Sequence, residues 1–213
     1  MAARDPLSIL FGSTARVKLL RFFLFNPSKE FSFDDISKRA KLVRRTARTE
    51  MNALEKAEVI KQKTIYIEVE GKAKKMKAIG YSVNKDFPEL QALQTFLFET
   101  APIDGKNLLK HLRQAGVLDF VGVSGVFVRD FEQRLDVLLA MKKFSQAKVE
   151  KAIRSLEAEI GIEIRFAAMS SEDLMYRVGM YDKLTRDFFD YTHQVLVDKI
   201  GVRDEVMSHS TFR

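Results

Sequence analysis

The segment from Phe33 to Ile60 constrains the fold of this chain most, because its pattern predicts two short helices with a tight break between them. The first helix is expected from Phe33 to Ala40, with the turn at Lys41 and Leu42, and the second ends near Glu58. With about 3.6 residues per turn, four apolar positions of the second helix share one side and should face a core: Val43, Ala47, Met51 and Leu54.

The opposite side of this second helix carries polar side chains at helical spacing: Arg45, Arg48, Thr49 and Asn52. Arginine suits the edge of guanine, asparagine suits adenine, and threonine can meet a base or a phosphate, so these four residues are candidate base readers. Arg44 and Lys41 flank them and are candidate phosphate contacts. A basic run alone more often forms a solvated helix face, so this interpretation also depends on the neighbouring segments.

The segments on either side of the helix pair extend the pattern. A helix is expected from Leu7 to Asn26, where Pro27 ends it. Strands are expected over residues 64–69 and 76–83, joined by a basic hairpin tip. The tip lysines are candidate backbone or minor-groove contacts: Lys72, Lys74 and Lys75. This order of elements is typical of a winged helix, so we predict a winged helix-turn-helix DNA-binding domain over residues 1–86.

Charge is distributed unevenly along the chain. The formal net charge is +7, and residues 1–88 hold 19 basic and 10 acidic residues, whereas the rest of the chain holds 17 basic and 19 acidic residues. This asymmetry favours a nucleic-acid-binding domain joined to a nearly neutral one. The polar break that ends at Pro88 is the best candidate boundary, so the second domain is expected over residues 87–213.

The pattern of the second domain changes along its length. A helical lead-in is expected over residues 88–116, and an α/β core over residues 117–200. Within the core, strands are expected over 117–128, 135–141, 162–169 and 195–200, with helices over 145–160 and 170–191. This alternation predicts a small mixed sheet covered by helices, and an α+β fold class for the whole chain. The tail, residues 201–213, is expected to be irregular.

Residues 117–200 carry a further pattern, formed by the turn Gly122-Val123-Ser124-Gly125, the triplet Arg134-Leu135-Asp136, and Glu163 or Arg165 in a later strand. On these residues the domain resembles the small nucleotidyltransferases of the DNA-polymerase-beta type. The run from Ile162 to Tyr191 further resembles a family of predicted bacterial transcription regulators that fuse a winged helix to such a domain, and this resemblance covers nearly the whole chain. The resemblance implies a Gly-Ser turn, an Asp-x-Asp pair on the next strand and a third carboxylate on a later strand.

This sequence departs from the family pattern at the position of the first aspartate, where Arg134 stands. Two-metal phosphoryl transfer needs carboxylates that hold two cations, and a fixed positive charge repels them. We therefore expect a degenerate, catalytically inactive transferase domain that holds no metal or cofactor. Asp136 is expected to be a structural ion-pair partner rather than a metal ligand.

Other features restrict the remaining function classes. The chain has no cysteine, and its three histidines have no metal-ligand spacing. No signal peptide and no apolar run of membrane-spanning length is visible, so a cytoplasmic location without membrane attachment is expected. A single winged helix contacts few base pairs, so a homodimer is also expected.

Together these features predict a transcription regulator that binds double-stranded DNA sequence-specifically. Its second domain is expected to serve assembly or to sense a small-molecule or nucleotide effector. Two alternatives remain open from the sequence. One is an active nucleotidyltransferase that a winged helix targets to DNA. The other is an antitoxin-like protein-interaction module whose basic face binds an acidic partner.

Overall fold

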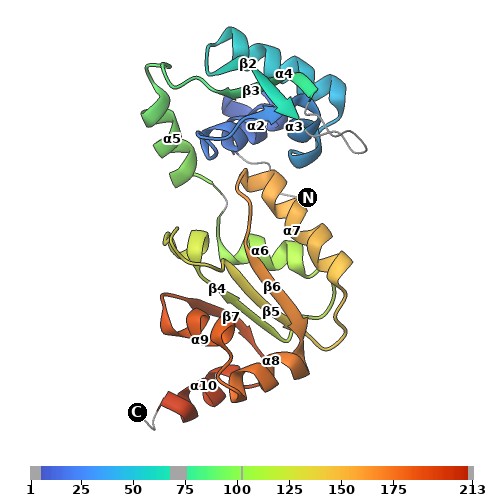
Figure 1. Cartoon of the computed structure of the whole chain (residues 1–213), viewed down its shortest axis with the longest axis vertical. Helices are drawn as coiled ribbons and strands as arrows, with labels where there is room; N and C mark the ends of the chain where they lie inside the picture. The colour runs from blue at the N-terminus through green and yellow to red at the C-terminus, as the bar shows by residue number, and fades with distance from the viewer. Residues whose placement is uncertain (1–5, 68–75, 102, 211–213) are drawn as a thin grey trace. The chain divides into compact units, whose positions relative to one another are not determined.

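The computed structural model describes residues 6–67, 76–101 and 103–210, and in these residues the fold is of the mixed α+β class (Figure 1). The described residues form ten α-helices and two sheets, one of which is mixed. The chain divides into two compact units, which are residues 1–102 with 157–162, and residues 103–156 with 163–213. The boundary expected after residue 86 differs from this division, because helix α5 (Leu90–Glu99) belongs to the first unit.

The first unit begins with two helices where the sequence predicted one. Helix α1 covers Pro6–Leu10 and helix α2 covers Thr14–Leu24. Gly12 separates them with a φ of +78°, a left-handed conformation that glycine adopts without steric cost. The Oγ of Ser13 then accepts a hydrogen bond from the backbone N–H of Arg16 and caps α2. The expectation of a continuous helix over residues 7–26 was therefore wrong.

The predicted helix pair is present as α3 (Phe33–Arg39) and α4 (Arg44–Lys56). The Oγ of Ser32 accepts a hydrogen bond from the N–H of Asp35 at the start of α3. Lys41, with a φ of +50°, makes the turn between the helices. Three of the four apolar positions predicted for the core side of α4 are buried: Ala47, Met51 and Leu54. The prediction was wrong for Val43, which is 74% exposed because it is the residue that precedes the first helical turn.

The sheet of the first unit has the strand order β1-β3-β2 and is antiparallel. Strands β2 (Ile60–Ile67) and β3 (Met76–Val83) form the predicted hairpin, and β1 (Phe31–Ser32) adds a short third strand that was not predicted from the sequence. The hairpin tip, with Lys72, Lys74 and Lys75, lies outside the described residues. Ile60 pairs with Val83 at the base of the hairpin, and both residues are buried in the core of the unit.

Helix α2 is the centre of the core of the first unit. Its residues Leu19, Phe23 and Leu24 are almost completely buried, and Leu97 of α5 joins the same cluster. Arg21 of α2 is 1% exposed and its guanidinium donates to the carbonyls of Thr100 and Glu159, at the carboxyl ends of two helices. A cation is favoured at such ends because the last carbonyls of a helix lack intrahelical donors.

The second unit has a four-stranded sheet in the order β6-β5-β4-β7, as Figure 1 shows. The strands are β4 (Phe120–Val123), β5 (Val137–Met141), β6 (Phe166–Ser170) and β7 (Gln194–Asp198). Strands β5 and β6 are parallel and the other pairs are antiparallel, so the predicted mixed sheet is present. Residues 125–128 form a 3₁₀ turn rather than the end of the first predicted strand, and Glu163 and Arg165 precede β6 instead of lying on it.

Helices α6 (Gly105–Leu112) and α7 (Gln146–Ile160) occur where they were predicted. The long helix predicted over residues 170–191 is divided into α8 (Ser171–Gly179) and α9 (Lys183–Asp190), because Tyr181 adopts a φ of +55° between them. The tail expected to be irregular instead forms α10 (Val202–Ser210). No helix in the described ranges is long and apolar enough to cross a membrane.

Candidate functional site

Helix α4 presents a continuous polar face to solvent. The residues that the sequence predicted as base readers all lie on it and all are exposed: Arg45, Arg48, Thr49 and Asn52. Arg44 is exposed in the first turn of the helix, and Lys41 is exposed in the preceding turn. The structure therefore brings six of the nine candidate DNA-binding residues to one surface, and the other three lie at the hairpin tip, outside the described residues.

Phe33, the first residue of α3, holds two of these arginines. The guanidinium carbon of Arg48 lies 3.9 Å from the centroid of the Phe33 ring, and that of Arg44 lies 5.3 Å from it. The Nη1 of Arg48 also donates to the Oη of Tyr81 at 3.3 Å, and the Nη1 of Arg44 forms an ion pair with Asp34 at 2.6 Å. Stacking on an aromatic face restricts a guanidinium, so Arg48 is held in one orientation at the surface.

The remaining polar side chains of α4 differ in whether they already have a hydrogen-bond partner. Among the described residues, the side chains of Arg45 and Asn52 have no hydrogen-bond or ion-pair partner, so both can bind a ligand without breaking a contact. The hydroxyl of Thr49 donates to the carbonyl of Arg45 at 3.1 Å, one turn earlier in the same helix. Its oxygen can still accept a hydrogen bond there.

The buried side of α4 is fixed to the rest of the first unit by an ion pair as well as by apolar contacts. The Nε of Arg16 on α2 lies 2.8 Å from the Oε2 of Glu50, a residue that is 8% exposed. The Nη1 of Arg16 donates in addition to the carbonyl of Phe11. Because Glu50 lies on the side of α4 opposite the arginine stripe, this contact fixes which face of the helix points outward.

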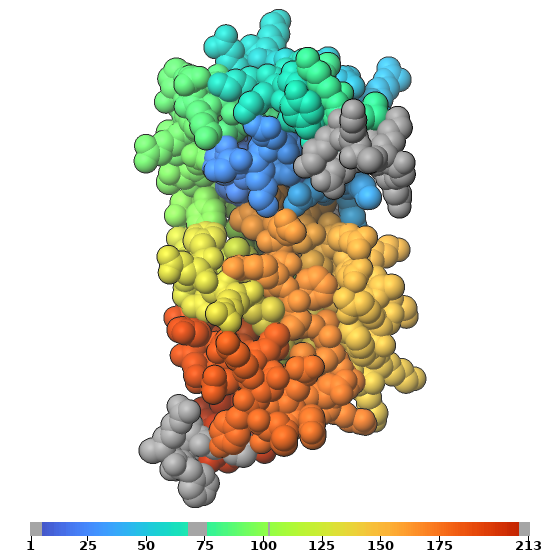
Figure 2. Space-filling model, in the orientation of Figure 1, coloured from blue at the N-terminus to red at the C-terminus, as the bar shows by residue number. Residues whose placement is uncertain are grey.

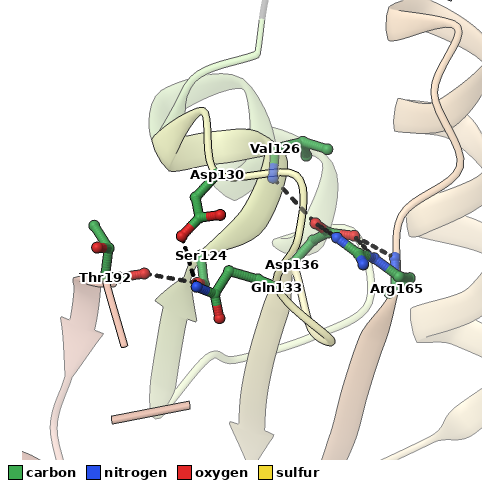
Figure 3. Close-up of polar contacts among 7 residues, drawn as sticks. All are labelled: Ser124, Val126, Asp130, Gln133, Asp136, Arg165 and Thr192. Atoms are coloured by element: carbon green, nitrogen blue, oxygen red, sulfur yellow. Dashed lines mark hydrogen bonds and ion pairs between the residues drawn. The ribbon is translucent and has the colours of Figure 1, made fainter. Parts of the chain in front are cut away.

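The second candidate site surrounds Asp136, which is completely buried in the second unit (Figure 3). Its Oδ1 accepts hydrogen bonds from the N–H of Val126 at 3.0 Å and the Nη2 of Arg165 at 2.8 Å. Its Oδ2 accepts from the backbone N–H of Arg165 at 2.8 Å and the Nε of Arg165 at 2.9 Å. The ion pair expected of Asp136 is therefore present, and Arg165 is its partner.

These four donors fill the lone-pair directions that a carboxylate offers, so Asp136 has no position left for a divalent cation. The hydrogen bond from the Arg165 side chain to Asp136 raises the pKa of Arg165; burial lowers it, and the charge of Asp136 raises it further. Arg165 thus carries a permanent positive charge beside the only aspartate of the predicted pair. The residues at this position do not fit a two-metal transferase centre.

The turn that follows β4 is shaped around this ion pair. Gly125 has a φ of +53°, and a Cβ atom built on it would lie 1.9 Å from the Oδ1 of Asp136. The Oγ of Ser124 donates to the carbonyl of Thr192 at 2.7 Å (Figure 3). Gly122 lies at an irregularity in the pairing of β4 with β7, where a Cβ atom would meet the ring of Phe188. Gly122, Ser124 and Gly125 of the predicted Gly-Ser turn therefore each have a structural role.

Two of the residues predicted for this site do not join the Asp136 ion pair. Arg134 is 78% exposed at its side chain and lies 3.6 Å from Asp187 on α9. Glu163 is exposed in the segment before β6. Among the described residues, no group of three or more histidine, cysteine, aspartate or glutamate side chains is arranged to hold a metal ion.

A cavity of about 820 Å³ lies beside this turn in the second unit. Ser124 and Arg134 of the predicted site line it, together with four acidic residues and one lysine: Asp130, Glu132, Asp182, Asp187 and Lys183. The four carboxylates outnumber the two cations, so the electrostatic potential of the lining opposes a polyanion. This charge balance disfavours a nucleoside triphosphate as the occupant.

The residues that orient the candidate sites were not predicted from the sequence. Phe33 and Tyr81 hold Arg48, and Asp187 pairs with Arg134, although each lies far from its partner along the chain or in another element. No short-range periodicity marks such partners. The basic stripe of α4 could have suggested that an aromatic residue lies beneath it, but not which one.

Comparison with known proteins gives no relative on which to base a function. No protein-family model, no curated protein and no solved structure matches this chain. The functional assignment therefore rests on the two surfaces described above, and of these the exposed face of α4 has the clearer chemistry.

Proposed function

We propose that this chain is a transcription regulator that binds double-stranded DNA sequence-specifically, with the first unit acting as a winged helix and α4 as its recognition helix. The observation that carries the proposal is the exposed stripe of Arg45, Arg48, Thr49 and Asn52 on a helix whose opposite side is buried. An α-helix fits the major groove, and these side-chain types match the hydrogen-bonding edges presented there.

The supporting contacts fit such a role. Arg48 is held by Phe33 and Tyr81, which reduces the conformational entropy lost when it binds a base edge. Arg45 and Asn52 are exposed and have no described partner, so they can form bidentate contacts. Lys41 and Arg44 flank the stripe and suit phosphates, as do Lys72, Lys74 and Lys75 at the hairpin tip.

In this proposal the second unit has no transferase activity and serves dimer assembly or effector sensing in the cytoplasm. The saturated lone pairs of Asp136 and the acidic lining of the nearby cavity support the absence of transferase activity. A homodimer would present two copies of α4 to two half-sites, and so double the number of base contacts.

The test begins with selection of duplexes from a random pool by the wild-type protein, followed by fluorescence anisotropy with the selected duplex and a scrambled one. Replacing Arg45 by alanine is expected to reduce the preference for the selected duplex by about 1–3 kcal/mol, because a bidentate base contact is lost. Non-specific binding that weakens with salt should persist in this variant.

Lys85→Ala is the matched control, because Lys85 is an exposed cation of the same unit in the turn after β3 and its substitution removes one charge as well. This variant should keep the preference for the selected duplex. A selection that yields no common motif, or an Arg45→Ala variant as selective as the wild type, would contradict the proposal. Failure to bind any duplex at low salt would favour the antitoxin-like interaction module instead.

A further inference from the structure

The hairpin has one face that changes from buried to exposed along its length. Cross-strand partners share a face, and every second pair lies on the same side of the sheet. On the face that begins with the buried pair Ile60 and Val83, the next pair is Gln62 with Tyr81, of which Tyr81 is 4% exposed. The first pair and Tyr81 therefore adjoin the core, whereas Gln62 is exposed.

Beyond those pairs the same face is no longer covered by the described elements, but it stays partly apolar. Thr64 pairs with Ile79, which is 62% exposed, and Tyr66 pairs with Lys77, while Tyr66 is itself 68% exposed. Figure 2 shows the hairpin residues, cyan to green, at the surface of the first unit. Tyr66 and Ile79 are diagonal neighbours on this face, so they form a contiguous exposed apolar patch, which suggests a contact surface.

This face is the one that adjoins helix α4. The Nη1 of Arg48 donates to the Oη of Tyr81, and the Nε2 of Gln62 donates to the Oε2 of Glu55 on α4 at 3.2 Å. Both contacts involve the second pair of the face, one pair before Ile79. Because successive pairs on one face are about 7 Å apart along the strands, Ile79 and Tyr66 continue the surface that the α4 stripe begins.

We propose that Tyr66 and Ile79 form an apolar contact surface for the same DNA duplex that α4 reads, through the faces of the strands rather than through the hairpin tip. This inference rests on the proposed DNA-binding function. Charge selects the occupant, because Lys77 is the cross-strand partner of Tyr66 and Arg48 contacts Tyr81 of the preceding pair. Among the described residues, the acidic contact of this face is Glu55, which lies on Gln62 at the end nearer the core, and the two cations fit a polyanion. A second copy of the chain would place these cations against their equivalents, which costs free energy.

Apolar side chains at such a position can pack against deoxyribose and thymine methyl groups or against a base step. They supply affinity without displacing counterions, so their contribution is independent of salt, unlike that of arginine and lysine. The footprint on DNA thereby extends to the flank of the base pairs that α4 contacts.

The direct test uses the wild-type protein and tyrosine nitration followed by mass spectrometry. Tyr176 of the second unit is the internal control, because it is 68% exposed, as is Tyr66. When the selected duplex is added at a saturating concentration, the nitration rate of Tyr66 is expected to fall about fivefold or more relative to that of Tyr176. A Tyr66 that nitrates equally fast in the complex overturns the inference, while the measured binding leaves the proposed function standing.

The second test compares the double variant Tyr66→Ala/Ile79→Ala with Met76→Ala, which truncates an apolar side chain on the opposite face of the hairpin. The double variant should bind the selected duplex about tenfold more weakly, or about 1.4 kcal/mol, with an unchanged dependence of affinity on salt. Affinity within twofold of the wild type, or a loss shared by Met76→Ala, overturns the inference. If the wild type binds no duplex, the proposed function and this inference fail together.

Discussion

At the scale of single residues, Asp136 shows how this sequence departs from a metal-dependent transferase. All four of its acceptor directions are occupied by donors from Val126 and Arg165. A buried carboxylate with one arginine partner is costly to leave unpaired, so the pair depends on every neighbour that shapes it. Gly125 is one of these neighbours, because any side chain on it would collide with the Oδ1 of Asp136.

Substituting Gly125 by alanine is therefore expected to destabilise the second unit by about 3 kcal/mol or more, since both the φ of +53° and the collision with Asp136 act against it. Gly179→Ala is the matched control, because nothing lies within 4 Å of a Cβ atom built there and alanine favours a helix. Urea unfolding of both variants measures the difference. Equal stability would show that the turn rearranges without cost.

At the scale of secondary-structure elements, Asp198 determines the start of α10. Its Oδ1 accepts from the N–H groups of Ile200, Gly201 and Val202, and its Oδ2 accepts from that of Arg203. Burial raises the pKa of Asp198, but the backbone hydrogen bonds together outweigh it, so the pKa lies below its usual value. The ionised carboxylate also interacts favourably with the amino-terminal end of the helix.

This lowered pKa sets the direction of a pH dependence. The carboxylate contributes stability above its unfolded pKa of about 3.9, and the contribution is lost as the pH falls through the lower folded pKa. Asp198→Asn should therefore be about 1 kcal/mol less stable than the wild type at pH 7, and the difference should shrink below about pH 4. Chemical unfolding between pH 3 and 7 measures it, with exposed Asp190→Asn as control. A difference independent of pH would contradict the assignment.

The elements differ in how well their sequence patterns predicted them. Helices α3 and α4 and the hairpin strands carry strong periodicity, so their types and approximate bounds were predictable. Strand β1 has two residues and no periodicity, and its pairing with β3 is a tertiary contact. Helix α10 was missed because it depends on the cap that Asp198 provides and on tertiary packing of Val202. The break at Tyr181 requires a left-handed residue that the sequence does not mark.

The candidate site was predictable to a similar degree. The arginine stripe follows from helical spacing alone, since one side of α4 must be buried. The sequence does not show which residue pairs with Asp136 or which pairs with Arg134. Arg134 and Arg165 were both available to Asp136, and several acidic residues were available to Arg134. Short-range patterns define which face a residue occupies, whereas ion-pair choice depends on the packed arrangement of distant elements.

At the scale of the whole molecule, charge and chemistry divide between the two units. The basic excess lies in residues 1–88, and the cavity of the second unit is lined mainly by carboxylates. A ligand that binds only the folded state raises the midpoint of thermal unfolding, so the two units should respond to different additives. We therefore expect the first unit to bind duplex DNA, which is a polyanion, and the second unit to bind no nucleoside triphosphate.

Thermal unfolding with Mg²⁺ and a mixture of nucleoside triphosphates is expected to leave the midpoint unchanged. Addition of the selected duplex at one hundred times its dissociation constant should raise the midpoint in the same assay, because binding then adds about 2.7 kcal/mol to the free energy of unfolding. The duplex serves as the positive control for detection. A saturable shift with Mg²⁺ and triphosphate, or transfer of a nucleotide to any acceptor, would reinstate the active transferase.

The composition of the first unit also bears on the order of events during synthesis. Residues 157–162 belong to it, and the Nδ2 of Asn26 and the guanidinium of Arg21 donate to the carbonyls of Gly161 and Glu159. A Cβ atom on Gly161 would lie only 2.6 Å from the backbone of Arg21, so this segment packs directly on α2. A ribosome that has finished residue 102 must add about sixty more before the unit is whole, roughly 3–12 s of translation. Until residues 157–162 have been synthesised, the surface of α2 that they cover stays exposed on the nascent chain. Chaperones are expected to bind this exposed surface.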